Sequence, residues 1–418
     1  MIYQPRDALA MLVLTSHFRC SCISEKMFVF NILALGVTLR LAAAAPPTGR
    51  AIINPQLGPY PVTISNVELQ TDRDDPLAPE PGTKRRLMLS IFQPQFDSFA
   101  CTNRNYAPYM PNRTAEATLN TDLGGVSLST LPGAYIEGLQ VEYCAQKANA
   151  TTGDAPILLF QHGYQGSRLE YQVLLSGIAS SGYTIVSIDI TYEAPVVEFP
   201  DGSYVLNNTG FTDDGLGPDD TLPVRAADYS SVIDALESGK LVISSSQKTE
   251  RKHVKPGVFG HSIGGAAAVL AASQDKRIAA AVNWDGQFFP AQANLTVHQP
   301  TLLFQREQVL PYQKASWEQE WALLKGSKAW IAGIGTEHLS FTDLPILAEA
   351  EGLREGNEQI ITALGGSIAP GRMREIAWKY TVDFFDGIFK DGKAALLDKP
   401  STEFPDVRFL KTSVRLQG

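Results

Sequence analysis

The sequence predicts an α/β fold built on a mostly parallel, doubly wound sheet. Between about residues 62 and 389, apolar strand-like runs alternate with helix-like runs, and no Gly/Ser-rich or Pro-rich linker interrupts them. Right-handed crossovers between such strands place helices on both faces of a parallel sheet. One middle strand runs directly into a helix of small residues, and two alternating segments near the N-terminus predict an added antiparallel hairpin.

The hairpin is predicted from residues 61–70 and 86–92, which alternate apolar and polar residues and are separated by turn-forming residues. The acidic run at residues 72–75 lacks the glycine and the distal glutamate of a calcium loop, so we expect a solvated turn there. The basic run Lys84-Arg85-Arg86 is expected to be the solvated start of the second strand.

The parallel strands are predicted where apolar runs are continuous, because a strand buried on both faces of a sheet carries few polar residues. These runs are residues 156–160, 183–190, 258–259, 278–282, 301–304 and, as the final strand, 329–334. A capping box formed by Ser167 and Glu170 predicts a helix that ends near Gly182. Further helices are predicted at about residues 221–238, from residue 264, and at residues 373–389.

Two segments fall outside this alternation. Residues 192–220 form a long polar insertion without periodicity, which is typical of a lid or a substrate wall. Residues 1–45 contain an apolar stretch at 27–45 that ends in small residues, as a secretory signal does, and Met27 is an alternative start. A membrane anchor is the rival interpretation, which two polar residues within the stretch weaken. We expect residues 46–418 to form a single α/β domain.

Charge and cysteine usage favour an exported protein that does not bind nucleic acid. The formal net charge is −9, and removal of residues 1–45 makes it more negative. Cys101 and Cys144 are the cysteines that follow residue 45, so we expect one disulfide, with two buried free thiols as the alternative. Sequons predict glycosylation at Asn112, Asn149, Asn207 and Asn294. We expect neither a cofactor nor a metal.

The turn Gly260-His261-Ser262-Ile263-Gly264 links the apolar residues 258–259 to the small-residue helix. Glycines two before and two after the serine allow a turn so sharp that the hydroxyl stands exposed above the sheet. A chance match in a loop is the alternative, but the strand before the turn and the helix after it favour a nucleophile elbow. The sequence therefore predicts the α/β-hydrolase fold with Ser262 as the nucleophile.

A serine hydroxyl needs a base, and the base needs an orienting acid. Among the six histidines, His338 directly follows the last predicted strand and lies downstream of the serine, which is where this fold places its base. Two carboxylates are candidates for the acid. Asp285 follows the strand after the elbow and Glu307 follows the next strand, and both lie at carboxyl ends of strands.

Acyl transfer also requires donors for the developing oxyanion. The backbone N–H of Ile263 is the first candidate, and the His-Gly turn after the first parallel strand predicts the N–H of Tyr164 as the second. Trp284, Phe288 and Phe289 are adjacent apolar residues that either wall an acyl pocket or belong to the core.

Together these residues resemble the platelet-activating factor acetylhydrolases, secreted branch, and related lipase-like α/β-hydrolases. The resemblance rests on the His162-Gly163 turn, the elbow, Asp285 with its aromatic neighbours, and His338 followed by Ser340-Phe341-Thr342-Asp343. It implies that Asp285 is the acid. It also implies a calcium-independent esterase that removes short acyl groups, such as acetyl at the sn-2 position of ether phospholipids. The sequence departs from the family's pattern at Tyr164-Gln165, in the 192–220 insertion and in the N-terminal segment.

Three functions agree with the predicted fold and site. The first is a secreted short-acyl esterase whose partner is a small-molecule or lipid ester and which contacts lipid surfaces transiently. The second is a secreted carboxylesterase that acts on cutin-like, polyester or plant-wall esters, because fold and triad serve both. The third is a hydrolase-fold binding protein without activity. All three triad residues are present in the sequence, which favours the enzymes.

Overall fold

The central sheet of the computed structural model has nine strands within the residues that the structure describes. Those residues are 51–96, 101, 104–121, 128–130, 136, 138–145, 155–209, 217–243, 253–292, 295–390 and 392–413. The strand order is β14-β13-β12-β11-β10-β6-β7-β3-β2. The predicted signal region at residues 1–45 lies outside the described residues. Among the helices that are described, none has both the length and the apolar character needed to cross a membrane.

Six neighbouring strands form the parallel part of the sheet, which confirms the predicted α/β-hydrolase architecture. They are β6 (Ile157–Gln161), β7 (Thr184–Ile188), β10 (Gly257–His261), β11 (Ala280–Trp284), β12 (Thr301–Gln305) and β13 (Lys328–Gly333). Nearly every residue in them is buried, as the continuous apolar runs predicted. The elbow strand β10 lies between β6 and β11, so its carboxyl end opens at the middle of the sheet.

The N-terminal hairpin is confirmed and is longer than predicted. Its strands are β2 (Val62–Asp74) and β3 (Lys84–Pro94), and β3 joins the sheet by antiparallel pairing with β7. The acidic run is therefore partly strand, since Asp72 to Asp74 belong to β2. The prediction of a solvated turn is wrong for Asp75, which is buried.

The expected solvation of the basic run is also wrong for Arg85. Its side chain is fully buried and pairs with Asp75 at 2.9 Å and with Asp228 at 2.6 Å. Asp228 belongs to α3 (Pro218–Glu237), so the ion pairs fasten the hairpin to a helix. A charge run looks solvated in a sequence, but a guanidinium can be buried when carboxylates from distant elements meet it.

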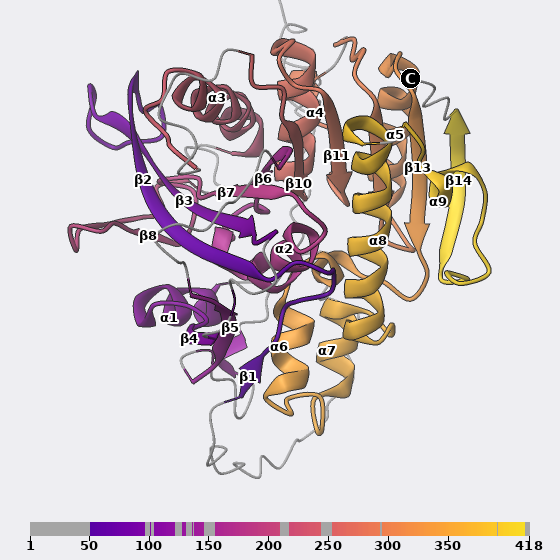
Figure 1. Ribbon diagram of the computed structural model, residues 1–418, viewed down its shortest axis with the longest axis horizontal. Helices are drawn as coiled ribbons and strands as arrows, with labels where there is room; N and C mark the ends of the chain where they lie inside the picture. The colour runs from indigo at the N-terminus through magenta and orange to yellow at the C-terminus, as the bar shows by residue number, and fades with distance from the viewer. Residues whose placement is uncertain are drawn as a thin grey trace, which may run out of the picture.

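Helices cover both faces of the sheet. On one face, α3 packs beside α4 (Ile263–Gln274), and the two lie together near the top of Figure 1. On the other face, α2 (Gln172–Ala179) packs beside α8 (Pro370–Phe389). A short 3₁₀ helix, η4 (Arg168–Tyr171), precedes α2, and its start is capped by Ser167 and Glu170 as predicted.

The last strand of the sheet was not predicted. Strand β14 (Val407–Ser413) pairs antiparallel with β13 at the edge of the sheet, so residues 329–334 are not the final strand. Its residues are mostly exposed or half-buried, and such an edge strand carries a weak apolar signal. Helix α5 (Pro311–Leu323) also escaped prediction, although its Trp317 is buried in the core.

A second group of elements lies in the lower part of Figure 1, below the main sheet. It contains β1 (Ile52–Ile53), β4 (Arg104–Pro108), β5 (Gln140–Cys144), α1 (Asn112–Asn120), α6 (Leu344–Ala350) and α7 (Glu358–Gly365). The predicted disulfide between Cys101 and Cys144 is formed at the end of β5. Residues of β1, β5, α1 and α6 share one apolar core with the start of α2, and α7 packs on α6 through Ile361 and Ala348.

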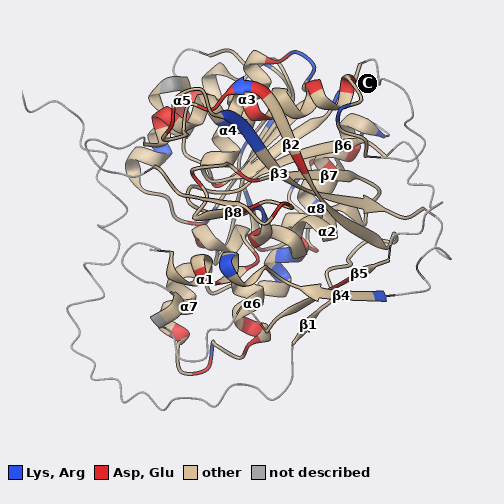
Figure 2. Ribbon diagram, turned by 90° about the vertical axis from the view of Figure 1, so that its left-hand side faces the viewer, with Lys and Arg blue, Asp and Glu red and all other residues tan. Residues whose placement is uncertain are grey.

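The 192–220 insertion is only partly irregular. It contains the strands β8 (Val196–Glu198) and β9 (Tyr204–Leu206), a hairpin that projects at the left of Figure 1. Its residues 210–216 lie outside the described residues. In Figure 2, lysine, arginine, aspartate and glutamate residues are interspersed over the described chain, and this view shows no face on which basic residues gather.

Candidate active site

The Gly-x-Ser-x-Gly turn joins β10 to α4 and holds Ser262 in a conformation that a serine rarely adopts. The φ angle of Ser262 is 56° and its ψ angle is −131°. A Cβ on Gly260 would collide with the backbone of Gly264, and a Cβ on Gly264 would collide with the Gln161 carbonyl. The flanking glycines are therefore required by close backbone contacts, and the strain at Ser262 has the form expected of a nucleophile elbow.

His338 lies within hydrogen-bond distance of both Ser262 and Asp285. His338 begins η6 (His338–Phe341), after β13, and its Nε2 is 3.0 Å from Ser262 Oγ. Its Nδ1 is 2.6 Å from Asp285 Oδ2. A carboxylate accepts a proton donor, so Nδ1 carries the hydrogen and Nε2 is left to accept the serine O–H.

Asp285 is buried and is held ionised by its neighbours. The Arg306 N–H donates to Oδ1 at 2.9 Å, and the Arg306 guanidinium lies 3.0 Å from Oδ2. Burial raises the pKa of Asp285, but Arg306 and His338 outweigh that effect, and the pKa falls below its ordinary value. Arg306 was not singled out in the sequence, although it directly precedes Glu307, which was.

Glu307, the other candidate acid, has a different position. Its Oε2 accepts the N–H of Gly335 at 2.7 Å, and the Glu307 N–H donates to Thr336 Oγ1. Glu307 thus holds the turn that precedes His338, while Asp285 contacts the imidazole itself. The structure thus distinguishes the two candidate acids, which the order of the strands alone did not.

The two predicted oxyanion donors belong to segments that lie next to Ser262. Ile263 is the first residue of α4, so its N–H has no intrahelical acceptor and lies at the positive end of the helix dipole. Tyr164 follows Gly163, whose position is so close to the elbow that an added Cβ would lie 3.3 Å from Ser262 Cβ. The N–H of Gly163 itself donates to the Tyr171 hydroxyl at 3.1 Å.

His261 links the two sides of the site, a role that its place in the elbow motif did not predict. Its Nδ1 is 2.8 Å from the Tyr171 hydroxyl and its Nε2 is 3.0 Å from the His338 carbonyl. Because a carbonyl only accepts, Nε2 carries the hydrogen and Nδ1 accepts from Tyr171. Burial holds the pKa of His261 well below its ordinary value, so the ring is neutral.

The expectation of an acyl pocket at residues 284–289 is not supported for Trp284. Its indole is fully buried, packs at steep angles against the rings of Phe160 and Phe259, and donates to Thr381 on α8. Phe288 is also buried, and Phe289 packs against the core of the opposite face. These positions agree with the core alternative. A separate apolar hollow is lined by residues of α1, η6, α6 and α7, among them Leu339, which follows His338.

The four predicted glycosylation sites have different settings. Asn112 is exposed at the start of α1, whereas the Asn207 amide donates to the Glu193 carbonyl and to Thr209. Asn149 and Asn294 lie outside the described residues. Within the part of the chain that the structure describes, no group of His, Cys, Asp and Glu side chains is arranged to hold a metal ion.

A strained serine at the centre of a mostly parallel sheet, joined through histidine to a buried carboxylate, defines an α/β-hydrolase with a catalytic-triad geometry. Residues 242–366 match the family model described as platelet-activating factor acetylhydrolase, isoform II. Over 408 residues, the chain is 28% identical to a protein of Arthroderma benhamiae named probable 1-alkyl-2-acetylglycerophosphocholine esterase, covering 92% of this chain and 100% of that protein. The chain is thus similar in sequence to the platelet-activating factor acetylhydrolases, over residues 242–366 for the family model and over most of its length for the relative.

A solved structure is similar over most of the chain as well. The ferulic acid esterase from Streptomyces cinnamoneus superposes with a TM-score of 0.68 and 29% identity, covering 88% of this chain and 99% of that one. The family match, the fungal relative and this structure together support an esterase.

Proposed function

We propose that this chain is a serine esterase in which Ser262 is the nucleophile, His338 the general base and Asp285 the orienting acid. The observation that carries the proposal is the unbroken set of hydrogen bonds from Ser262 Oγ through the imidazole to the Asp285 carboxylate. Each step of acyl transfer can be assigned to an atom of this set.

In the proposed cycle, Ser262 Oγ attacks the ester carbonyl while its proton passes to His338 Nε2. The carbonyl oxygen becomes an oxyanion, which the N–H groups of Ile263 and Tyr164 stabilise. The tetrahedral intermediate collapses, the bond to the leaving alkoxide breaks, and His338 Nε2 returns the proton to that oxygen. Water then attacks the acyl-enzyme in the same manner and releases the acid and Ser262.

Asp285 contributes through charge. The imidazolium that forms in each half-reaction bears its positive charge 2.6 Å from a carboxylate that is already ionised. Arg306 keeps that carboxylate ionised and fixes its direction through two contacts. The arrangement therefore favours the transition state, in which the histidine is charged, over the ground state, in which it is neutral.

We propose short acyl esters of the 1-alkyl-2-acetylglycerophosphocholine type as the substrates. The family match and the fungal relative's name support this assignment. A second candidate, an ester of the plant cell wall such as a feruloyl ester, is favoured by the similarity to the bacterial ferulic acid esterase. Fold and triad serve both reactions equally, so the pockets for the acyl and alcohol groups decide between them.

The esterase is tested with p-nitrophenyl acetate. We expect burst release of p-nitrophenol from the wild type and a loss of kcat of roughly 10⁴-fold or more in Ser262→Ala. Retained turnover in that variant would exclude Ser262 as the nucleophile, and a wild type without turnover would leave a binding protein as the alternative. The substrate class is tested by comparing kcat/KM for acetyl and long-acyl glycerophosphocholines with that for methyl ferulate. Preference for the feruloyl ester would overturn the phospholipid assignment.

We also propose that the chain is exported and that residues 1–45 are its signal. The disulfide between Cys101 and Cys144 supports an oxidising compartment, and exposed Asn112 is an accessible sequon. N-terminal sequencing and a glycosidase shift of protein recovered from culture medium would test both points. An uncleaved chain retained in the cell would contradict them.

A further inference from the structure

The turn after β6 is held by an unusual number of donors to one carbonyl. The Gly163 carbonyl accepts from His162 Nδ1 at 2.7 Å, from the Gly166 N–H at 3.1 Å and from Arg225 Nη2 at 3.2 Å. The preceding His162 carbonyl accepts from Arg225 Nη1 at 2.8 Å. One guanidinium therefore spans two successive carbonyls of the turn.

These contacts determine where the next N–H points. A trans peptide unit is planar, and its C=O and N–H point in opposite directions. The Gly163 carbonyl belongs to the same peptide unit as the Tyr164 N–H. By directing the carbonyl toward Arg225, the donors direct the Tyr164 N–H the other way, in a turn that lies against Ser262.

Arg225 is suited to a fixed position because it is fully buried and its charge is balanced. Its guanidinium pairs with Glu193, whose side chain is also fully buried, and Arg225 Nε lies 2.9 Å from Glu193 Oε2. The Arg225 carbonyl accepts from Gln161 Nε2, one residue before the turn. Helix α3 and strand β6 are thus joined at this point by polar contacts in both directions.

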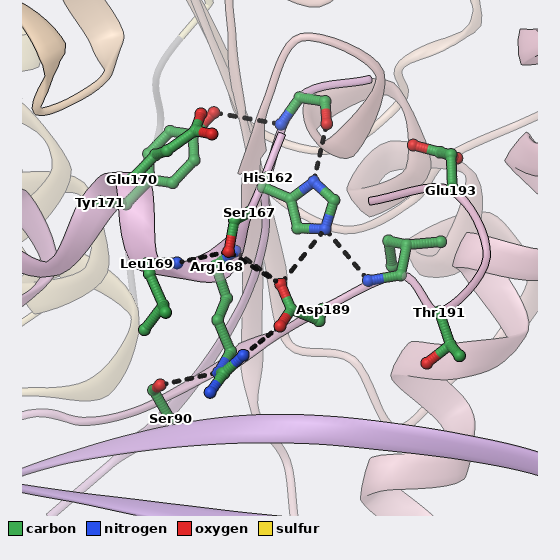
Figure 3. Close-up of polar contacts among 12 residues, drawn as sticks. Ser90, His162, Ser167, Arg168, Leu169, Glu170, Tyr171, Asp189, Thr191 and Glu193 are labelled. Carbon is green, nitrogen blue, oxygen red and sulfur yellow. Dashed lines mark hydrogen bonds and ion pairs between the residues drawn. The ribbon is translucent and has the colours of Figure 1, made fainter. Parts of the chain in front are cut away.

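The His162 ring contributes as a neutral donor (Figure 3). The Ile190 N–H donates to Nε2 at 3.0 Å, which leaves the hydrogen on Nδ1 for the Gly163 carbonyl. Burial, aided by Arg225, holds the pKa of His162 well below its ordinary value. Asp189 approaches Nε2 to 3.8 Å, but its carboxylate is engaged by Arg168, so this approach is no ion pair with the neutral ring.

We propose that Arg225, balanced by Glu193, is a positioning residue that aims the Tyr164 N–H at the oxyanion formed on Ser262. The inference rests on the proposed esterase function. Arg225 touches neither the serine nor the histidine of the triad in the contacts described above, so its effect would pass through the peptide plane of the turn. If the Tyr164 N–H no longer points at the oxyanion, it stabilises the transition state less, while binding of the ground state is largely unchanged.

The test is Arg225→Lys, with Arg85→Lys as the matched control. Both arginines are fully buried and pair with buried carboxylates, but Arg85 contacts Asp75, Asp228 and the Thr191 carbonyl in place of the carbonyls of the turn. A lysine keeps the charge but cannot span two carbonyls. The readouts are kcat and KM for p-nitrophenyl acetate, the inhibition constant of trifluoroacetone, and the melting temperature.

Trifluoroacetone reports on the oxyanion directly. Ser262 Oγ adds to its carbonyl carbon, the serine proton passes to His338, and the ketone oxygen becomes an oxyanion bound by the donors. We expect Arg225→Lys to lower kcat about 10- to 100-fold, less than the roughly 10²- to 10³-fold effect of losing one donor outright, with KM changed less than about twofold. The inhibition constant should rise by the same factor as kcat/KM falls. Arg85→Lys should lower the melting temperature and leave both kinetic values within about twofold of wild type.

Several results would overturn the inference. Unchanged kcat in Arg225→Lys would do so, as would an equal kinetic loss in Arg85→Lys, which would indicate a general effect of stability. If Arg225→Lys does not fold, Glu193→Gln takes its place and should weaken turnover and trifluoroacetone binding in parallel; no change in either would refute the role. Failure of the esterase proposal is recognised separately, because the wild type would then show no turnover or Ser262→Ala would retain it.

Discussion

Two regions of this molecule bury carboxyl groups, and their neighbours give them opposite properties. At the carboxyl edge of the sheet, the Arg306 guanidinium and His338 hold the pKa of Asp285 below its ordinary value despite burial. Where η4 and α2 meet the loop after His338, burial raises the pKa of Glu170 to about 8 and that of Asp343 to about 7. Hydroxyl and backbone N–H donors contact the second pair, but they do not offset desolvation as a cation does.

The difference shows that burial alone does not mark a catalytic carboxylate. Asp285 faces a histidine whose side chain is 27% exposed and within reach of the serine, so its charge acts on a group that substrate can approach. Asp343 instead accepts the N–H groups of Val173 and Leu174 at the start of α2, together with the Tyr109 hydroxyl. It fastens the segment that follows His338 to α2 and to Tyr109, which directly follows β4.

The largest effect is expected from a substitution of Asp285, the buried carboxylate that is ionised. Asp285→Asn removes the negative charge beside the imidazole and favours the wrong histidine tautomer, and we expect kcat to fall by roughly 10⁴-fold. Steady-state kinetics with p-nitrophenyl acetate measure this loss. The matched control is Glu307→Gln, which keeps an acceptor for the Gly335 N–H and should remain near wild type. The reverse ranking would assign the acid to Glu307.

In the second region, the protonated carboxyl group of Glu170 should make the stability of the fold depend on pH. The pKa of Glu170 is raised to about 8 in the fold, so between its unfolded value and that pH the folded chain binds more protons than the unfolded chain. Stability is then greatest at low pH in this window and falls as pH rises toward 8, by at most about 1.4 kcal/mol per pH unit from one group. Glu170→Gln cannot ionise and should lose that slope.

Denaturant unfolding of wild type and Glu170→Gln at several values from pH 5 to 8 measures the slope. The difference in unfolding free energy should shift in favour of the variant as pH rises. Parallel curves would mean that Glu170 is not protonated in the fold. Asp343→Asn is expected to show the same trend over a lower range, because the pKa of Asp343 is raised only to about 7.

The sequence predicts features that depend on residues close together in the chain, but not contacts between residues that are far apart in it. Local patterns encode the elbow, the order of Ser262, Asp285 and His338, and the parallel strands, so these features were predicted from the sequence alone. The partners of these residues were not. Arg85 and Arg306 come from segments that look like surface, and their carboxylates lie on distant elements. Arg225 offered one signal, since it follows Leu222 by three residues on the stripe of α3 that also carries buried Tyr229.

Tyr171 joins the two regions, and its removal should have the smallest effect. It follows Glu170, accepts the Gly163 N–H and donates to His261, whose other nitrogen holds the His338 carbonyl. Tyr171→Phe leaves that N–H and the His261 nitrogen without their partner, and we expect a two- to tenfold fall in kcat, which corresponds to the roughly 0.5–1.5 kcal/mol of one hydrogen bond. The control is Tyr229→Phe, which removes an equally buried hydroxyl that donates to the Phe259 carbonyl. A similar fall in both variants would mean that Tyr171 supports only the core; a fall confined to Tyr171→Phe, with KM unchanged, would place its hydroxyl in the support of the oxyanion turn.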